Sequence, residues 1–319
     1  MRHAAIVCLT ILMVFGVRAD APTAQKPLPI FGINLSMYGP GGPDQFVDDL
    51  ATHELFASLA IPFIRIPIRQ GVSDARLRSV MRSVARSGAV PVVILHGASV
   101  GSPLRVDLHL LSLVRGVFGS RRVYLELGNE EDNSGISAVR YTGMWNLVVP
   151  RLRSQSPSSY VYGGPAAFMN DVAYITSFVR HASPRPGFIS WHEYVCSTAD
   201  SDAYCEAHIA RWGVHVSRTN AALRQAIGRS LPIMITEWNL DPNPDPRYQR
   251  PGFIEPWTIH ALTQLQQLLG QGLIGAMYYT ATSNADELIT SRRRLTAEGS
   301  AWWQALPSPS SSIARRLGG

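Results

Sequence analysis

Eight short apolar segments recur along this 319-residue chain, separated by stretches with helical periodicity. Most of the segments are almost continuously apolar, which is typical of parallel strands that are covered on both faces. Eight strand–helix repeats in a chain of this length predict an α/β fold, a single (β/α)8 TIM barrel. The expected strands are residues 31–36, 63–68, 90–96, 123–130, 160–165, 188–194, 233–239 and 276–280.

The main alternative is an open, doubly wound sheet. Such sheets usually have fewer strands, and many carry a glycine-rich phosphate-binding loop after the first strand. No G-x-G-x-x-G loop of this kind follows residues 31–36. A composition that is 46% hydrophobic and 16% charged suits one large core. We therefore expect the barrel to span residues 20–306, with helices in segments such as 44–60 and 74–86, and a disordered Ser/Pro tail at 307–319.

The first residues have the pattern of an export signal. A short basic start precedes an apolar run from Ala4 to Val17, which is too short to span a bilayer comfortably. Small residues flank Arg18 at the usual cleavage spacing, so residues 1–19 are expected to be a signal peptide removed after Ala19. This predicts a secreted or periplasmic protein without stable membrane association after cleavage. A retained membrane anchor is the alternative.

Charge and cysteine content narrow the possible partners. The net charge of +6 is modest, and its one dense run, Arg292-Arg293-Arg294, is expected on a solvated helix face rather than in a nucleic-acid patch. Cys196 and Cys205 remain after signal cleavage, and an even number of cysteines in an exported chain favours a disulfide. A zinc site that also uses His192 and His208 is the alternative.

Two glutamates end apolar runs in similar contexts. Glu130 follows Leu125-Glu126-Leu127-Gly128-Asn129, and Glu237 follows Ile233-Met234-Ile235-Thr236. A parallel barrel gathers the carboxyl ends of its strands at one face, where the active sites of this fold lie. Glu130 and Glu237 are therefore expected in one pit. Two carboxylates in one pit are the minimal apparatus for cleaving a glycosidic bond.

These motifs resemble the glycoside hydrolases of clan A, which are retaining (β/α)8 enzymes that include family 5 cellulases and mannanases. The resemblance covers about residues 30–306. Glu131 stands where family 5 commonly has proline, so a related family without that proline also fits. The eighth segment carries Tyr278-Tyr279 where many members have a sugar-binding tryptophan. The matching motifs, in chain order, are Ile64-Arg65-Ile66-Pro67, Leu95-His96, Asn129-Glu130, His192-Glu193-Tyr194 and Thr236-Glu237-Trp238.

The resemblance implies roles for the two carboxylates and their neighbours. Glu130 would be the general acid/base and Glu237 the nucleophile. Asn129 would bind the sugar 2-hydroxyl, and Arg65 would keep Glu237 ionised. General physics supports this division, because a nearby guanidinium lowers the pKa of a carboxylate, and a neighbouring anion raises that of an acid.

The remaining candidates for substrate binding are His96, His192, Tyr194 and Trp238. Each has a plain structural alternative: His96 and Trp238 could be core residues, and His192 and Tyr194 could serve packing only. Arg65 could instead be the buried partner of Glu126, which shares strand parity with Glu130 and would need a cation inside the barrel. Asn34 is expected to be a turn residue rather than a sugar ligand.

The sequence therefore predicts a secreted retaining glycoside hydrolase that acts on a poly- or oligosaccharide, as a monomer and without metal or other cofactor. Three alternatives stay open. A transglycosylase would use the same glutamate pair with a different acceptor. A non-catalytic barrel would only bind glycans. A metal-dependent hydrolase would need a set of strand-end ligands, and the first segment has no His-x-His motif.

Overall fold

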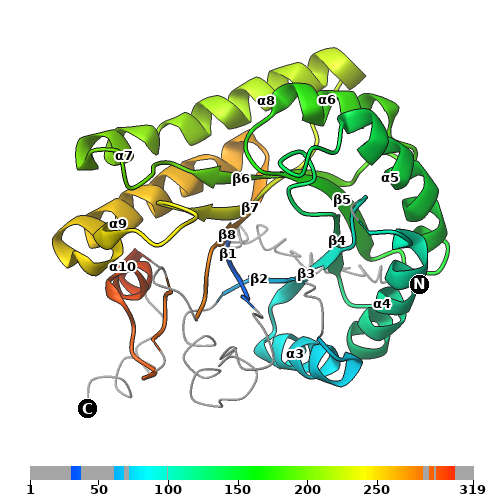
Figure 1. The fold of residues 1–319 in the computed structure, drawn as a ribbon, viewed down its shortest axis with the longest axis horizontal. Helices are drawn as coiled ribbons and strands as arrows, with labels where there is room; N and C mark the ends of the chain where they lie inside the picture. The colour runs from blue at the N-terminus through cyan, green and yellow to red at the C-terminus, as the bar shows by residue number, and fades with distance from the viewer. Residues whose placement is uncertain are drawn as a thin grey trace, which may run out of the picture.

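A computed structural model describes residues 30–36, 61–67, 72–98, 100–282, 287–290 and 292–305. Within them, eight parallel strands pair in sequence order, and β8 closes the sheet against β1 (Figure 1). This confirms the predicted single (β/α)8 barrel. The strands are β1 (Phe31–Asn34), β2 (Phe63–Ile66), β3 (Val90–Leu95), β4 (Val123–Leu127), β5 (Tyr160–Ala167), β6 (Phe188–Tyr194), β7 (Ile233–Asn239) and β8 (Leu273–Tyr278).

Helices surround the barrel on its outer side (Figure 1). They are α3 (Asp74–Ser87), α4 (Pro103–Phe118), α5 (Ala138–Arg153), α6 (Val172–His181), α7 (Asp202–His208), α8 (Arg211–Ile227), α9 (Pro251–Gln267) and α10 (Ala297–Ala305), with 3-10 turns η1 (Pro246–Gln249) and η2 (Leu269–Gln271). The expected helix at 44–60, the signal at 1–19 and the tail at 307–319 lie outside the described residues. None of the described helices combines the length and apolarity needed to cross a membrane.

Helix α3 shows how local sequence sets an element's ends. The Ser73 hydroxyl accepts a hydrogen bond from the Arg76 backbone N–H and so caps the first turn. Gly88 ends the helix with a φ of 80°, a left-handed conformation that glycine adopts at little cost. The apolar side chains that recur between these ends, Leu77, Val80 and Val84 among them, are buried against the barrel.

Side chains inside the barrel form an apolar floor with a polar layer above it. Tyr124 lies at the centre of the floor and makes edge-to-face contacts with Phe63 and Phe188. Strand side chains alternate between the two faces, so the next inward residue of each strand lies one layer closer to the carboxyl ends. On β2 and β4 these next residues are Arg65 and Glu126. The floor therefore supports a buried ionic layer.

Several expected element bounds differ from those of the structure. Strand β8 begins at Leu273 rather than at residue 276. Helix α9 begins at Pro251, because proline is compatible with the first turn of a helix. The exposed arginines 292–294 lie in a turn beside the isolated bridge between Ile289 and Leu295, not in a helix.

Candidate active site

The two glutamates predicted to be catalytic meet at the carboxyl ends of the strands. Glu130 follows β4, Glu237 belongs to β7, and His192 of β6 lies between them. The His192 Nδ1 atom is 2.6 Å from Glu130 Oε1 and 3.4 Å from Glu237 Oε2. One side-chain donor or acceptor atom from each of the three residues lies within 4.8 Å of the others. The barrel thus brings into one cluster two carboxylates that are far apart in sequence.

The chain turns sharply after β4 to present Glu130. Gly128 has a φ of 75°, and Glu130 itself has a φ of 51°, which is uncommon for a residue with a side chain. The Glu130 backbone N–H donates to the Ala166 carbonyl at 2.9 Å and so ties this turn to β5. The side chain of Glu130 stays 24% exposed, so it is accessible from solvent.

A β-bulge on β7 turns Glu237 into the barrel. Ile235 pairs with Trp191 of β6, but the next pair along the ladder joins Glu237 to His192, so Thr236 is an extra residue. Without that extra residue, regular alternation from the inward-facing Met234 would place position 238 inside and position 237 outside. Bulges of this kind are frequent beside active sites, where they redirect a side chain.

The same bulge places Trp238 on the outer face of the strand. Its fully buried indole contacts Trp212 of α8, Tyr278 of β8 and Trp302 of α10, at ring-centroid distances of 5.8, 5.1 and 6.1 Å. The prediction that Trp238 binds substrate is therefore wrong, and the core alternative holds. Tyr278 also faces outward and donates to Glu298, so it is no sugar platform.

Arg65 forms hydrogen bonds to several polar side chains around the two glutamates. Its side chain is only 1% exposed. Nη1 donates to Glu237 Oε1 at 2.6 Å, and Nη2 donates to Asn129 Oδ1 at 2.6 Å. Nε donates to Glu126 Oε2 at 2.7 Å. The implied contact with Glu237 and the alternative pairing with Glu126 are therefore both present.

Asn34 is a site residue whose role the sequence did not reveal. Its Oδ1 accepts from Arg65 Nη1 at 3.0 Å, and its Nδ2 donates to the Thr236 carbonyl at 3.0 Å. It lies within β1, so the expectation of a turn residue was wrong. Its inward parity, which it shares across the ladder with Arg65, was the signal that could have identified it. Asn34 braces the guanidinium and the bulge together.

The environment of Glu237 keeps its carboxylate charged. Burial opposes ionisation, but the electrostatic interactions with His192 and Arg65 and the hydrogen bonds from Tyr194 and Arg65 outweigh it. The pKa of Glu237 therefore lies below its ordinary value. The Tyr194 hydroxyl donates to Glu237 Oε2 at 2.7 Å. Burial and the charge of Glu237 raise the pKa of Tyr194 well above its usual range, so this phenol remains a donor.

His96 lies just beyond β3 and is held by a residue of α4. Asp107 Oδ1 accepts from the His96 backbone N–H at 2.9 Å and lies 2.8 Å from the ring Nδ1. Asp107 is fully buried, and burial raises its pKa despite the hydrogen bonds from His96. The His96 ring is 27% exposed, which argues against the core alternative and leaves the ring accessible at the end of its strand.

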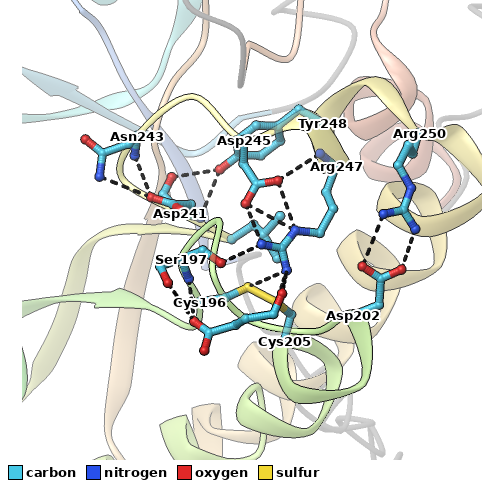
Figure 2. A network of polar contacts seen from close by, with 12 residues as sticks. Cys196, Ser197, Asp202, Cys205, Asp241, Asn243, Asp245, Arg247, Tyr248 and Arg250 are labelled. Atoms are coloured by element: carbon cyan, nitrogen blue, oxygen red, sulfur yellow. Dashed lines mark hydrogen bonds and ion pairs between the residues drawn. A yellow bond between two sulfur atoms is a disulfide. The ribbon is translucent and has the colours of Figure 1, made fainter.

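The loops that follow β6 and β7 are linked to each other by polar contacts (Figure 2). Cys196 and Cys205 form a disulfide with a Cα–Cα distance of 5.2 Å, as predicted. Arg247 donates to Asp245 and to the Ser197 carbonyl, and its Nη1 also contacts Cys205 Sγ (Figure 2). With both sulfurs bonded to each other, neither can be the thiolate ligand that the alternative zinc site required.

Comparisons with known proteins place the fold among glycoside hydrolases. No protein-family model matches the chain, and no curated protein matches its sequence. A GH39 β-xylosidase from Caulobacter crescentus aligns with a TM-score of 0.64 at 14% identity, covering 91% of this chain and 74% of the xylosidase. A GH128 endo-β-1,3-glucanase from Amycolatopsis mediterranei, a point mutant in complex with laminarihexaose, aligns with a TM-score of 0.58 at 16% identity, covering 86% and 98%.

A third similar structure is an oligosaccharide-binding protein. This GH128 protein from Trichoderma gamsii aligns with a TM-score of 0.52 at 15% identity, covering 88% of this chain and 96% of its own. The identities are too low to show more than a shared fold. The barrel is thus the one seen in clan A structures, which confirms the resemblance at the level of fold and leaves family 5 without specific support.

Proposed function

We propose that this protein is a retaining glycoside hydrolase with Glu130 as the general acid/base and Glu237 as the nucleophile. The observation that carries the proposal is the Glu130–His192–Glu237 cluster, whose interacting atoms lie within 4.8 Å of one another. The two carboxylate oxygens of Glu237 accept hydrogen bonds from Arg65 and Tyr194, and these bonds favour the anionic form of Glu237. Glu130 lies at the exposed edge of the cluster, where a leaving group can be protonated.

In the first step of the proposed reaction, a Glu237 oxygen bonds to the anomeric carbon while the bond to the leaving oxygen breaks. Glu130 gives its proton to that oxygen. In the second step, Glu130 removes a proton from water, the water oxygen bonds to the anomeric carbon, and the bond to Glu237 breaks. Asn129, fixed by Arg65 at 2.6 Å, is placed to bind the sugar 2-hydroxyl. Each displacement inverts the anomeric centre, so the pair gives retention.

The spacing of the two carboxylates favours retention over inversion. Inverting enzymes hold their carboxyl groups roughly 6.5–9.5 Å apart to admit a water, and retaining enzymes hold them about 5–5.5 Å apart. One carboxylate oxygen of Glu130 and one of Glu237 lie within 4.8 Å of each other, which supports the shorter separation of retaining enzymes.

The substrate is proposed to be a poly- or oligosaccharide. The similar structures include a β-xylosidase and a β-1,3-glucanase, and both enzymes are named for carbohydrate substrates. A hydrolysis screen across β-glucan, mannan, xylan and aryl glycosides tests the proposal, with Glu237→Gln as the matched inactive control. Release of reducing sugar or aglycone by wild type but not by the variant supports it, and equal release by both would count against it.

A glycan-binding barrel without activity is the second candidate, and one observation favours it. A similar structure is an oligosaccharide-binding protein. The complete glutamate pair, with its charge-stabilising partners, argues for catalysis instead. Glycan binding without turnover on any substrate of the screen would support this candidate.

Two further alternatives have their own tests. Product analysis distinguishes a transglycosylase from a hydrolase. Because Glu130, His192 and Glu237 could also hold a metal ion, loss of activity with a chelator would support a metal-dependent enzyme.

Export of the mature chain from residue 20 is part of the proposal. The disulfide suits an oxidising compartment, and the modest charge gives no reason to expect a nucleic-acid partner. We propose a monomer that is free of the membrane after cleavage. N-terminal sequencing of the exported protein and its elution volume in size-exclusion chromatography test these points.

A further inference from the structure

We propose that Glu126 is a positioning residue for the nucleophile: its buried carboxylate anchors Arg65 and shares the charge of that guanidinium with Glu237. The proposal rests on the proposed function, because it describes how that function's nucleophile is held. Glu126 lies on the inward face of β4, four residues before Glu130, and is fully buried. It occupies the layer between the apolar floor and the reacting carboxylates.

The geometry of Arg65 gives Glu126 this role. The guanidinium is a rigid, planar fork, so fixing one nitrogen restricts the directions of the other two. Glu126 Oε2 holds Nε at 2.7 Å. The remaining nitrogens then point to Glu237 Oε1 and Asn129 Oδ1, each at 2.6 Å. Moving the anchor would displace the nucleophile's partner and the proposed sugar ligand together.

The second oxygen of Glu126 shows that this carboxylate is retained at a cost. Among the described residues, Oε1 is buried and has no hydrogen-bond partner. A buried polar atom without a partner typically costs about 1–3 kcal/mol. A neutral residue of similar shape would avoid part of that cost, so a functional reason for the charge is expected.

Charge counting predicts the electrostatic effect. In the described part of the chain, the ionisable groups that contact Glu237 are Arg65 of β2 and His192 and Tyr194 of β6. Glu126 of β4 contacts Arg65, and Glu130, after β4, contacts His192. One guanidinium therefore serves two buried carboxylates. Neutralising Glu126 would leave the positive charge to Glu237 alone and remove a nearby anion. Both changes favour the ionised form of Glu237.

The test compares two variants by titrating the carboxyl group of Glu237. Glu126→Gln keeps an oxygen that can accept from Arg65 and loses the charge. Glu126→Asp keeps the charge and withdraws the acceptor by one methylene. The titration uses carbon NMR of protein labelled at the glutamate carboxyl carbons. Glu237→Gln assigns the signal, and circular dichroism defines the pH range in which each variant is folded.

We expect Glu126→Gln to titrate Glu237 at a lower pH than wild type, by about one pH unit. Glu126→Asp should lower kcat with little change in KM, because Arg65 is misdirected. Glu298→Gln is the matched control: it neutralises a buried carboxylate on the outer side of the barrel, where Tyr278 donates to it, and should leave the Glu237 titration unchanged.

An unchanged Glu237 titration in folded Glu126→Gln would overturn the charge-sharing role. Wild-type kcat in folded Glu126→Asp would overturn the anchoring role. The carboxyl titration needs no substrate, so it separates this proposal from the proposed function. A shifted titration in a protein that hydrolyses no glycan would support the inference while contradicting the proposed function.

Discussion

At the scale of single residues, the state of Glu237 is decided by a balance between burial and neighbouring charge. Burial alone would favour the neutral acid, but the electrostatic interactions with His192 and Arg65 and the hydrogen bonds from Tyr194 and Arg65 outweigh it. Arg65 is able to do this because its five N–H donors can serve Glu237, Asn129 and Glu126 together. A lysine would supply a charge without that fork, so the substitution would not be conservative here.

Glu237→Gln should abolish hydrolysis while the barrel stays folded. Glutamine retains the size and a hydrogen-bond acceptor for Arg65 but is no nucleophile, so kcat should fall by at least about 10³-fold. Steady-state kinetics and circular dichroism together check this. A folded variant with near-wild-type turnover would remove Glu237 from the mechanism.

Glu130→Ala should behave differently on different substrates. General acid help typically contributes ~10²–10⁴-fold, and aryl glycosides with good leaving groups need little of it. Their first step should therefore survive better than cleavage of natural glycosides. Added azide should restore turnover, because it attacks the glycosyl intermediate without base assistance. Equal losses on all substrates, with no response to azide, would contradict the acid/base role.

The depressed pKa of Glu237 predicts the acidic limit of activity. A nucleophile works only as the anion, so activity is lost as the pH falls through its pKa. Because that pKa lies below the ordinary value, the acidic limb of kcat/KM should fall below about pH 4.3. Rate measurements across acidic pH, confined to the folded range, check this. An acidic limb above about pH 5 that is assigned to Glu237 would be inconsistent with the observed neighbours.

Residue types and strand-end positions were enough to predict most of this site. Asn129, Glu130, His192, Tyr194 and Glu237 carry motifs that can be read from the sequence, and the structure brings them together or into contact with common partners. The inward parity of Asn34 could mark it as a residue of the barrel interior, but its bracing role could not be predicted, because it depends on hydrogen bonds to the neighbouring strand β2 and to β7. Only the closed sheet reveals which side chains share a layer.

At the scale of elements, the loops that follow β6 and β7 are held together by hydrogen bonds. Backbone N–H groups of Val195 and Cys196 both donate to the Leu240 carbonyl, at 3.1 and 3.0 Å. Arg247 then joins the second loop to the first through the Ser197 carbonyl (Figure 2). These loops begin where Tyr194 ends β6 and Asn239 ends β7, next to the strand ends that carry Tyr194 and Glu237.

Replacing both bonded cysteines, Cys196→Ser with Cys205→Ser, should lower stability by less than about 3 kcal/mol. The sequence separation is only 9, and short loops gain little from a cross-link. Denaturant unfolding with and without reductant measures the loss, and reductant should not affect the double variant. Titration of denatured, unreduced wild type should find these thiols blocked, and two free thiols would refute the disulfide.

One element could not be predicted from hydrophobic pattern. Strand β7 begins with the apolar run Ile233 to Ile235, and nothing in its sequence marks the bulge at Thr236. The bulge reverses which of positions 237 and 238 faces the barrel interior. The motif around Glu237 suggested Trp238 as a substrate-binding residue, but on the bulged strand Trp238 faces outward and packs in the outer core.

At the scale of the whole molecule, the barrel converts sequence order into proximity. Strands four and seven each deliver a carboxylate to the same end of the sheet, and strand six places His192 between them. This architecture could be predicted because parallel, doubly covered strands leave a repeating apolar pattern. The identity of the sugar and of its linkage cannot be predicted in this way, since they depend on the shape of the loops at the carboxyl ends of the strands.

The most direct test of the proposed mechanism is the anomeric configuration of the first-formed product, followed by proton NMR during hydrolysis. Because one carboxylate oxygen of Glu130 and one of Glu237 lie within 4.8 Å of each other, we expect direct attack by Glu237 and a double displacement. We expect the first product to have the same anomeric configuration as the substrate. An inverted first product would contradict both the retaining mechanism and the nucleophile role of Glu237.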